Sequence, residues 1–221
     1  MSISKIASIL FGLSAVLVIA TTQAIAARTP KDTHFAATDQ QTSIPIGWVL
    51  YCQAQPADCH APQPKTEALT LDDHRWNVLQ RINLLVNHQI AGLSDEDHYH
   101  IAAKGIANWW TYPDDGKGNC NDYVILKKRL LVEAGLDSSA LLLTVVLDHE
   151  QAGHLVLMVR TDRGDIILDN MTDDIVYWNE TGYTFLKRQT AENPNRWISF
   201  DNSVRTAAVR TAQAQQPAFR Q

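Results

Sequence analysis

The chain has 221 residues, of which 45% are hydrophobic and 19% charged, and it carries a formal net charge of −5 at pH 7. Its nineteen lysines and arginines are scattered along the sequence, which argues against a nucleic acid or an anionic membrane surface as a partner. About 195 residues follow a candidate N-terminal leader, a length typical of one domain with its own hydrophobic core.

Residues 1–26 have the pattern of a secretory signal peptide. Lys5 precedes an apolar run over residues 6–20, and the small residues 24–26 lie where a signal peptidase would cut. The run is shorter than the roughly 20 apolar residues that span a membrane. We therefore expect a periplasmic protein with no membrane contact after signal cleavage. An uncleaved N-terminal anchor is the alternative, and it would also export the rest of the chain.

The remaining chain divides by composition. Residues 27–46 lack apolar periodicity, so we expect a linker there. The folded domain is expected over residues 47–200. Residues 201–221 end in a run rich in alanine and glutamine, and we expect them to form a disordered tail.

Three cysteines in an exported protein leave one unpaired, because an oxidising compartment joins the others. Cys52 and Cys59 lie close together in a segment that contains a proline, which suits a local disulfide. Cys120 is then the free thiol. Such a cysteine is either a buried, inert side chain or a reactive one.

Helical periodicity begins near Thr70, which we expect to cap a helix with apolar positions recurring over residues 76–86. A second helix is expected over residues 95–109 or part of them. Residues 111–119 are dense in turn formers and predict a loop.

Directly after this loop, residues 120–135 predict a helix of about four turns that stops at Gly135. Cys120 lies in its first turn. There, unpaired backbone N–H groups and the positive end of the helix dipole favour a thiolate over a thiol. The same N–H groups are placed to stabilise an oxyanion, so the position alone makes Cys120 a candidate nucleophile.

The rest of the domain is expected to consist of strands. Residues 141–147 form an apolar, β-branched run, and residues 154–160 and 165–169 predict a hairpin joined at 161–164. Shorter strands are expected at 175–177, 183–187 and 197–200. N-terminal helices followed by a run of antiparallel strands make an α+β fold.

The register of the hairpin decides whether it supplies catalytic partners for the thiol. A two-residue turn at 162–163 would pair Arg160 with Asp165 and make His154 and Asp169 diagonal neighbours, roughly 7–8 Å apart on one face. A turn one residue longer would put them on opposite faces. A cysteine hydrolase needs an imidazole to move the proton and an acceptor to hold the imidazole, and this hairpin offers both.

The order of these three residues resembles that in the bacterial transglutaminase-like cysteine peptidases, which include the LapG-type periplasmic proteases that release surface adhesins. The likeness covers nearly the whole mature domain. It runs through Trp48, Cys52, Cys59, Trp110, Pro113, and residues 118–123, 140–146, 153–154 and 166–170.

The resemblance implies a transglutaminase-like, papain-like cysteine protease fold with N-terminal helices packed on an antiparallel sheet. It makes Cys120 the nucleophile, His154 the general base and acid, and Asp169 the orienting carboxylate. It further implies a peptide or protein substrate, a surface adhesin in the specific case, cut through an acyl-enzyme. A transamidase with the same triad and a non-catalytic binding module that kept the fold are the alternatives.

Trp109 and Trp110 precede the loop that leads to the thiol, and aromatic side chains often line peptide-binding clefts. We expect one of them to contact substrate and the other to lie in the core, and we assign the substrate contact to Trp110.

The flanks of the nucleophile depart from the family pattern. In calcium-dependent LapG-type enzymes acidic residues flank the cysteine and help bind calcium, whereas here Asn119 and Asn121 occupy those places. Calcium affinity depends on the number of anionic oxygens, and an asparagine contributes only a neutral carbonyl. We expect no required cofactor and weak or absent calcium binding. Asp122 is the remaining candidate ligand, with Asp114 and Asp115 as further sources of oxygen.

Overall fold

The computed structural model describes residues 34–60, 68–99 and 109–201. The expected signal peptide, and all of the expected tail after its first residue, lie outside these ranges. Among the helices in the described ranges, none is both long enough and apolar enough to cross a bilayer.

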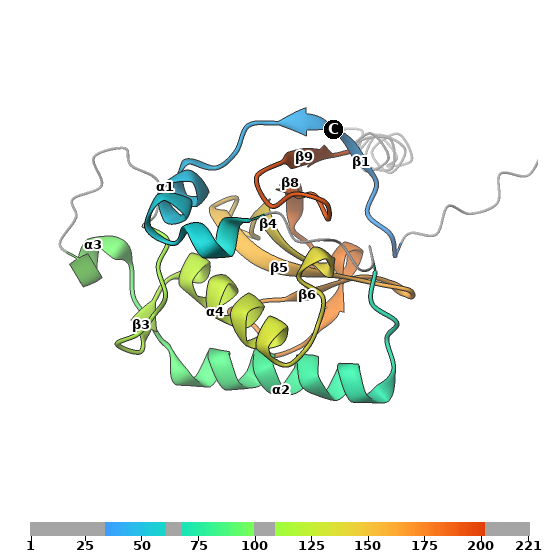
Figure 1. The fold of residues 1–221 in the computed structure, drawn as a ribbon, viewed down its shortest axis with the longest axis horizontal. Coiled ribbons are helices and arrows are strands. Elements are labelled where there is room, and N and C mark those ends of the chain that lie inside the picture. Colours follow the sequence, from blue (N-terminus) through green and yellow to red (C-terminus); the bar gives the residue numbers. More distant parts are fainter. Residues whose placement is uncertain (1–33, 61–67, 100–108, 202–221) are drawn as a thin grey trace, which may run out of the picture. The chain divides into compact units, whose positions relative to one another are not determined.

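A seven-stranded sheet forms the centre of the described part of the chain (Figure 1). Its strand order is β1-β9-β8-β4-β5-β6-β7, and every neighbouring pair is antiparallel. The strands are β1 (Thr38–Thr42), β4 (Leu141–Leu147), β5 (Gly153–Thr161), β6 (Gly164–Leu168), β7 (Val176–Tyr177), β8 (Thr184–Gln189) and β9 (Trp197–Phe200). A separate parallel pair joins β2 (Ala91–Gly92) to β3 (Lys117–Gly118).

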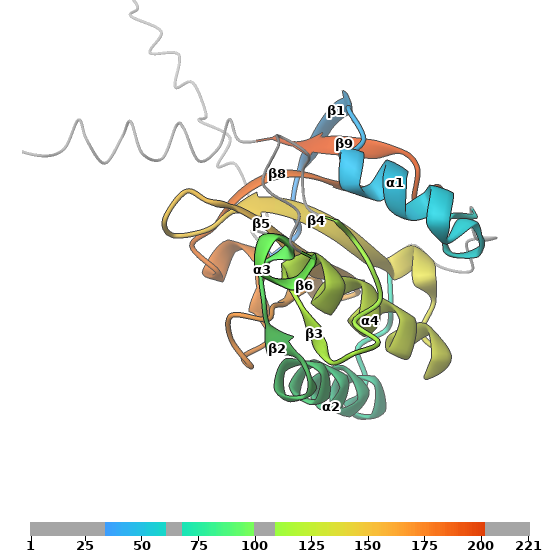
Figure 2. The ribbon, with the colours of Figure 1, turned by 90° about the vertical axis from the view of Figure 1, so that its left-hand side faces the viewer.

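The helices are α1 (Ile46–Ala54), α2 (Asp73–Gln89), α3 (Asp95–Tyr99) and α4 (Cys120–Glu133), with short 3-10 turns η1 (Pro56–Cys59), η2 (Ser138–Ala140) and η3 (Trp178–Glu180). Helix α4 packs against β5 on one side and α2 on the other, so it lies between α2 and the sheet (Figure 2). The expected α+β fold, with N-terminal helices on an antiparallel sheet, is confirmed.

Alternate residues of the central strands feed two hydrophobic clusters on opposite faces of the sheet, as the two-residue period of a strand requires. Leu141 and Leu143 of β4 belong to the larger cluster, which includes the buried faces of α2 and α4. Leu142 and Val146 belong to the smaller cluster, together with Phe185 of β8. This arrangement holds α4 firmly against one face of the sheet.

Residues 38–42 were expected within the linker 27–46, but they form the edge strand β1, paired with β9. Their sequence, Thr-Asp-Gln-Gln-Thr, lacks the apolar alternation that identifies a strand, because much of this edge faces solvent. The linker prediction was therefore wrong for these residues.

The expected helices form with two adjustments. The N-cap of α2 is Asp72 rather than Thr70, and its carboxylate accepts the N–H of Arg75 at 2.8 Å. Helix α3 covers only the start of the helix expected over residues 95–109, and residues 100–108 of that prediction lie outside the described ranges.

The expected disulfide forms between Cys52 of α1 and Cys59 of η1, with an S–S distance of 2.03 Å. Cys120 is free and half-buried. The pairing predicted from the number and spacing of the cysteines is therefore correct.

Candidate active site

Helix α4 presents Cys120 as its first residue, and a capping box fixes the turn around it. The side-chain oxygen of Asn119 accepts the N–H of Asn121 at 3.0 Å, and Oδ2 of Asp122 accepts the N–H of Asn119 at 2.9 Å. At the other end Gly135 takes a φ of +91°, which a glycine adopts without strain. The thiol is therefore held at the positive end of an ordered helix.

The hairpin of β5 and β6 has the register that the sequence predicted. Arg160 pairs with Asp165 and Leu157 with Leu168. The charged ends of the first pair also approach each other, with 3.5 Å between Nε of Arg160 and Oδ1 of Asp165. This register leaves His154, near the start of β5, on the same side as Asp169, one residue beyond β6.

Nε2 of His154 lies 2.8 Å from Oδ1 of Asp169, and both side chains are buried. The thiol of Cys120 also interacts with this imidazole and helps to raise its pKa, and the thiol itself donates to Oδ1 of Asn121 at 3.8 Å. The three residues that the sequence singled out therefore form one line, in which the imidazole interacts with both the carboxylate and the thiol, although they come from a helix start and the ends of two strands.

The charges of His154 and Asp169 stabilise each other. Burial alone would lower the pKa of His154, but its interactions with Asp169 and Cys120 outweigh burial and raise the pKa to about 9. Because this value lies above the ordinary value of 6.5, the stabilisation by the protonated ring is complete below pH 6.5. It is lost as the pH rises through 9.

Asp169 has a further partner that the sequence did not reveal. The hydroxyl of Tyr183 donates to Oδ2 of Asp169 at 2.6 Å, and the Met171 N–H donates to Oδ1 at 3.1 Å. Burial opposes ionisation of this carboxyl, but the hydrogen bond and charge of His154, followed by the Tyr183 hydroxyl, hold its pKa below the usual value. The Tyr183 ring also stands edge-on to the imidazole, with 5.8 Å between centroids. One side chain thus fixes both the carboxylate and the ring.

Asp122, the candidate calcium ligand, has both carboxylate oxygens engaged inside the protein. Oδ1 accepts the N–H of Thr111 at 2.8 Å, and Oδ2 caps α4. Burial raises its pKa to about 6, although these hydrogen bonds act in the opposite direction. Asp115, a further candidate, pairs with His98 at 2.8 Å.

Both carboxylate oxygens of Asp122 are thus already engaged by backbone N–H groups. Calcium takes roughly six to eight oxygen ligands, several of them carboxylates. Over the ranges that the structure describes, no three His, Cys, Asp or Glu side chains are grouped so as to hold a metal ion.

The structure places Trp110 in the core rather than on an open surface. Its indole lies on the backbone of α1, where a Cβ on Gly47 would come within 2.4 Å of Nε1, and its ring packs against Trp48. Trp109 is 46% exposed, and the two tryptophans border a cavity of about 140 Å³. Gly47 has no side chain and so leaves the space in which Trp110 is buried. Of the two tryptophans, Trp109 is the one exposed to solvent.

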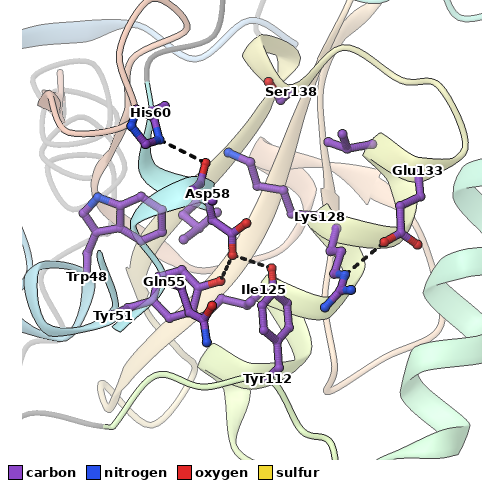
Figure 3. A pocket seen from close by; sticks show the side chains of 14 residues that line it. Trp48, Tyr51, Gln55, Asp58, His60, Tyr112, Ile125, Lys128, Glu133 and Ser138 are labelled. Carbon is purple, nitrogen blue, oxygen red and sulfur yellow. Dashed lines mark hydrogen bonds and ion pairs between the residues drawn. The ribbon is translucent and has the colours of Figure 1, made fainter. Parts of the chain in front are cut away.

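A cavity of about 520 Å³ lies between α1, η1 and α4, away from the thiol (Figure 3). Three of its charged groups, Asp58, Arg129 and Glu133, have partners within it. Asp58 accepts hydrogen bonds from the hydroxyls of Tyr51 and Tyr112, and Arg129 donates to Glu133 at 2.9 Å. Cys120, His154 and Asp169 do not border this cavity.

A second cavity, of about 290 Å³, borders the carboxylate end of the line. Asp169 and Tyr183 form part of its wall, with His149 and Met171, and Met171 is 59% exposed. Open space therefore adjoins the buried Asp169.

The sequence model of the family of bacterial transglutaminase-like cysteine proteinases matches residues 38–205 of this chain. The chain belongs to this family. It is thus a cysteine peptidase with the transglutaminase-like fold that the sequence resemblance implied, and the matched region includes the whole line from Cys120 to Asp169.

Among solved structures the chain is similar to LapG of Legionella pneumophila in several states. The calcium-bound form shares 22% identity at a TM-score of 0.47, over 56% of this chain and 68% of that chain. The EGTA-treated form shares 24% identity at a TM-score of 0.48, over 58% and 69% respectively. No curated protein matches the sequence.

Removing the Tyr183 hydroxyl from this cysteine peptidase tests its part in the site. Tyr183→Phe keeps the ring but frees Oδ2 of Asp169, so we expect kcat to fall by about 10-fold, the effect of losing one hydrogen bond to a charged group. KM should change little, because the hydroxyl is directed at Asp169. The measurement is steady-state hydrolysis of a peptide.

Tyr112→Phe is the matched control for this variant. Its hydroxyl binds Asp58 in the distant cavity, so the substitution should leave kcat unchanged. A Tyr183→Phe enzyme as active as Tyr112→Phe would show that the hydroxyl has no part in the reaction.

Proposed function

We propose that this protein is an exported peptidase in which Cys120 is the nucleophile, His154 the general base and acid, and Asp169 the residue that orients the imidazole. The observation that carries this proposal is the imidazole of His154, which lies 2.8 Å from the Asp169 carboxylate and whose pKa is raised by both Asp169 and Cys120. The contact between thiol and imidazole also argues against a binding module that has kept only the fold.

The first half of the reaction forms the acyl-enzyme. The reaction starts from the state in which the thiol proton is already on the imidazole, and the thiolate attacks the carbonyl carbon of the scissile amide. Backbone N–H groups in the first turn of α4 stabilise the negative charge that develops on the carbonyl oxygen. His154 then returns the proton to the departing amine as the C–N bond breaks, leaving a thioester on Cys120.

The second half releases the acyl group. Neutral His154 takes a proton from water, the hydroxide adds to the thioester carbonyl, and the sulfur leaves as the carboxylic acid product forms. Asp169 holds the ring in one orientation and stabilises its protonated form in both halves. An amine in place of water would give transamidation from the same thioester.

We assign the enzyme to the periplasm and a protein as its substrate. The leader-like sequence over residues 1–26 and the disulfide between Cys52 and Cys59 both suit an oxidising compartment outside the cytoplasm. The LapG-type resemblance suggests a surface adhesin as the substrate, and hence a role in biofilm release. Exposed Trp109 is the candidate substrate contact in place of buried Trp110.

The direct test of the proposed function is Cys120→Ala. Because the thiol forms the covalent bond, we expect hydrolysis of peptide and adhesin substrates to fall to background, with the melting temperature nearly unchanged. Activity is followed by peptide cleavage, and substrates by comparing periplasmic and surface proteins in cells that carry either form.

Two results would contradict the proposal. Undiminished peptide cleavage by the purified Cys120→Ala variant would remove Cys120 from the reaction. Incorporation of a dansyl amine into a glutamine-bearing acceptor, without hydrolysis, would show a transamidase instead of a peptidase.

Calcium is the metal to test, because calcium-dependent members occur in the family that the sequence resembles. Asp122 is engaged by backbone N–H groups, and asparagines replace the flanking acids. We therefore expect EGTA to change the rate of peptide hydrolysis by less than about twofold, given how strongly calcium sites depend on anionic oxygens. The rate is measured with EGTA and with added calcium.

The double variant Asn119→Asp with Asn121→Glu serves as the matched comparison, because it restores the two missing carboxylates. Calorimetry should detect more calcium bound by this variant than by the natural sequence. Loss of activity of the natural protein in EGTA, restored by calcium, would contradict the expectation.

A further inference from the structure

Lys127 is a buried cation directly beneath the candidate active site. Its side chain is 0% exposed, whereas lysines are almost never fully buried unless paired. It follows Cys120 by seven residues, which is two turns of helix, so both lie on the same side of α4. The apolar residues Val124 and Leu131 share this buried side.

The ammonium group contacts the main chain of the proposed catalytic carboxylate. Nζ of Lys127 donates to the backbone oxygen of Asp169 at 2.8 Å, and Nδ2 of Asn87 on α2 donates to the same oxygen at 3.0 Å. Asp169 is therefore fixed twice. His154 and Tyr183 hold its side chain, and α4 and α2 hold its main chain.

Asp169 needs such anchors because it lies past the last residue of β6, where the ladder with β5 has ended. Its neighbour Met171 is 59% exposed. An orienting group displaced by 1 Å can reduce a rate by about 100-fold, so the backbone position at Asp169 matters for catalysis.

Burial makes Lys127 costly for folding. It lowers the pKa of Lys127 to about 7, although the carboxylates of Asp169 and Asp173 act in the opposite direction. Between pH 7 and the ordinary lysine value of 10.5 the unfolded chain binds the proton better, so stability rises with pH over that range. An apolar side chain of similar length would avoid this cost, since replacing buried charges with packed apolar groups is often neutral or stabilising.

We propose that Lys127 is a positioning residue for the peptidase reaction, tying the main chain of Asp169 to the helix that carries the nucleophile. One helix then sets the positions of both ends of the triad. Its first residue supplies the thiol, and its eighth residue holds the main chain of Asp169, whose carboxylate orients the imidazole. The inference rests on the proposed roles of Cys120, His154 and Asp169.

Lys127→Met tests this inference, because methionine fills similar volume without a hydrogen-bond donor. We expect kcat to fall by up to about 100-fold, the cost of misplacing an orienting group by 1 Å, with KM nearly unchanged. The melting temperature at pH 7 should stay level or rise. The downfield proton resonance of His154 Nε2–H should shift or broaden as its bond to Asp169 loosens.

Lys128→Met is the matched control. This neighbouring lysine donates to Gln189 and is not in contact with the triad, so its loss should leave both kcat and the His154 resonance unchanged. Lys127→Gln is a second variant, with a shorter amide donor. It keeps the inference testable if methionine prevents folding, and its kcat should lie between those of the natural protein and Lys127→Met.

Three results would overturn the inference. One is a kcat within twofold of that of Lys128→Met, and another is an unchanged His154 resonance. The third is a loss of activity that merely follows the folded fraction. Each is distinct from failure of the proposed function. If Cys120→Ala is inactive while Lys127→Met is fully active, only the inference about Lys127 fails, whereas an active Cys120→Ala removes the triad itself.

Discussion

The hydrogen bond between Nε2 of His154 and Oδ1 of Asp169 is the interaction on which the rest of the site depends. A protonated imidazole is unstable inside a protein unless an anion lies against it. Here the carboxylate is 2.8 Å away, and with the Cys120 contact it raises the pKa of His154 to about 9 despite burial. The ring can therefore hold a proton at neutral pH beside the thiol, as a cysteine peptidase requires.

Two pieces of local structure bring these groups together. The capping box formed by Asn119 and Asp122 fixes the first turn of α4, and the tight turn after β5 fixes the register that puts His154 and Asp169 on one side. The packing of α4 between α2 and the sheet then brings the thiol to the imidazole. The carboxylate of Asp122 serves this helix cap.

The parts of the site that the sequence predicted depend on residues close together in the chain, such as a helix cap or a two-residue turn. The parts that it missed depend on distant contacts. Tyr183 is separated from Asp169 by 14 positions in the sequence, and Lys127 is separated from it by 42 positions. Neither residue lies in a local sequence pattern that marks it as part of a site. Trp110 was assigned to the substrate because the sequence does not show that it is buried, which depends on the space that Gly47 leaves beside it. The polar strand β1 was missed because only its pairing with β9 shows that it is a strand.

The most direct measurement of the central claim is the rate of Cys120 alkylation by iodoacetamide as a function of pH, in the natural protein and in Asp169→Asn. If the imidazolium holds a thiolate, the natural protein should react rapidly even at pH 6. An ordinary thiol slows about tenfold for each pH unit below roughly 8.5. In Asp169→Asn the alkylation rate of Cys120 should depend on pH more nearly as that of an ordinary thiol does. A natural protein that follows the ordinary profile, with no difference in the variant, would contradict the account.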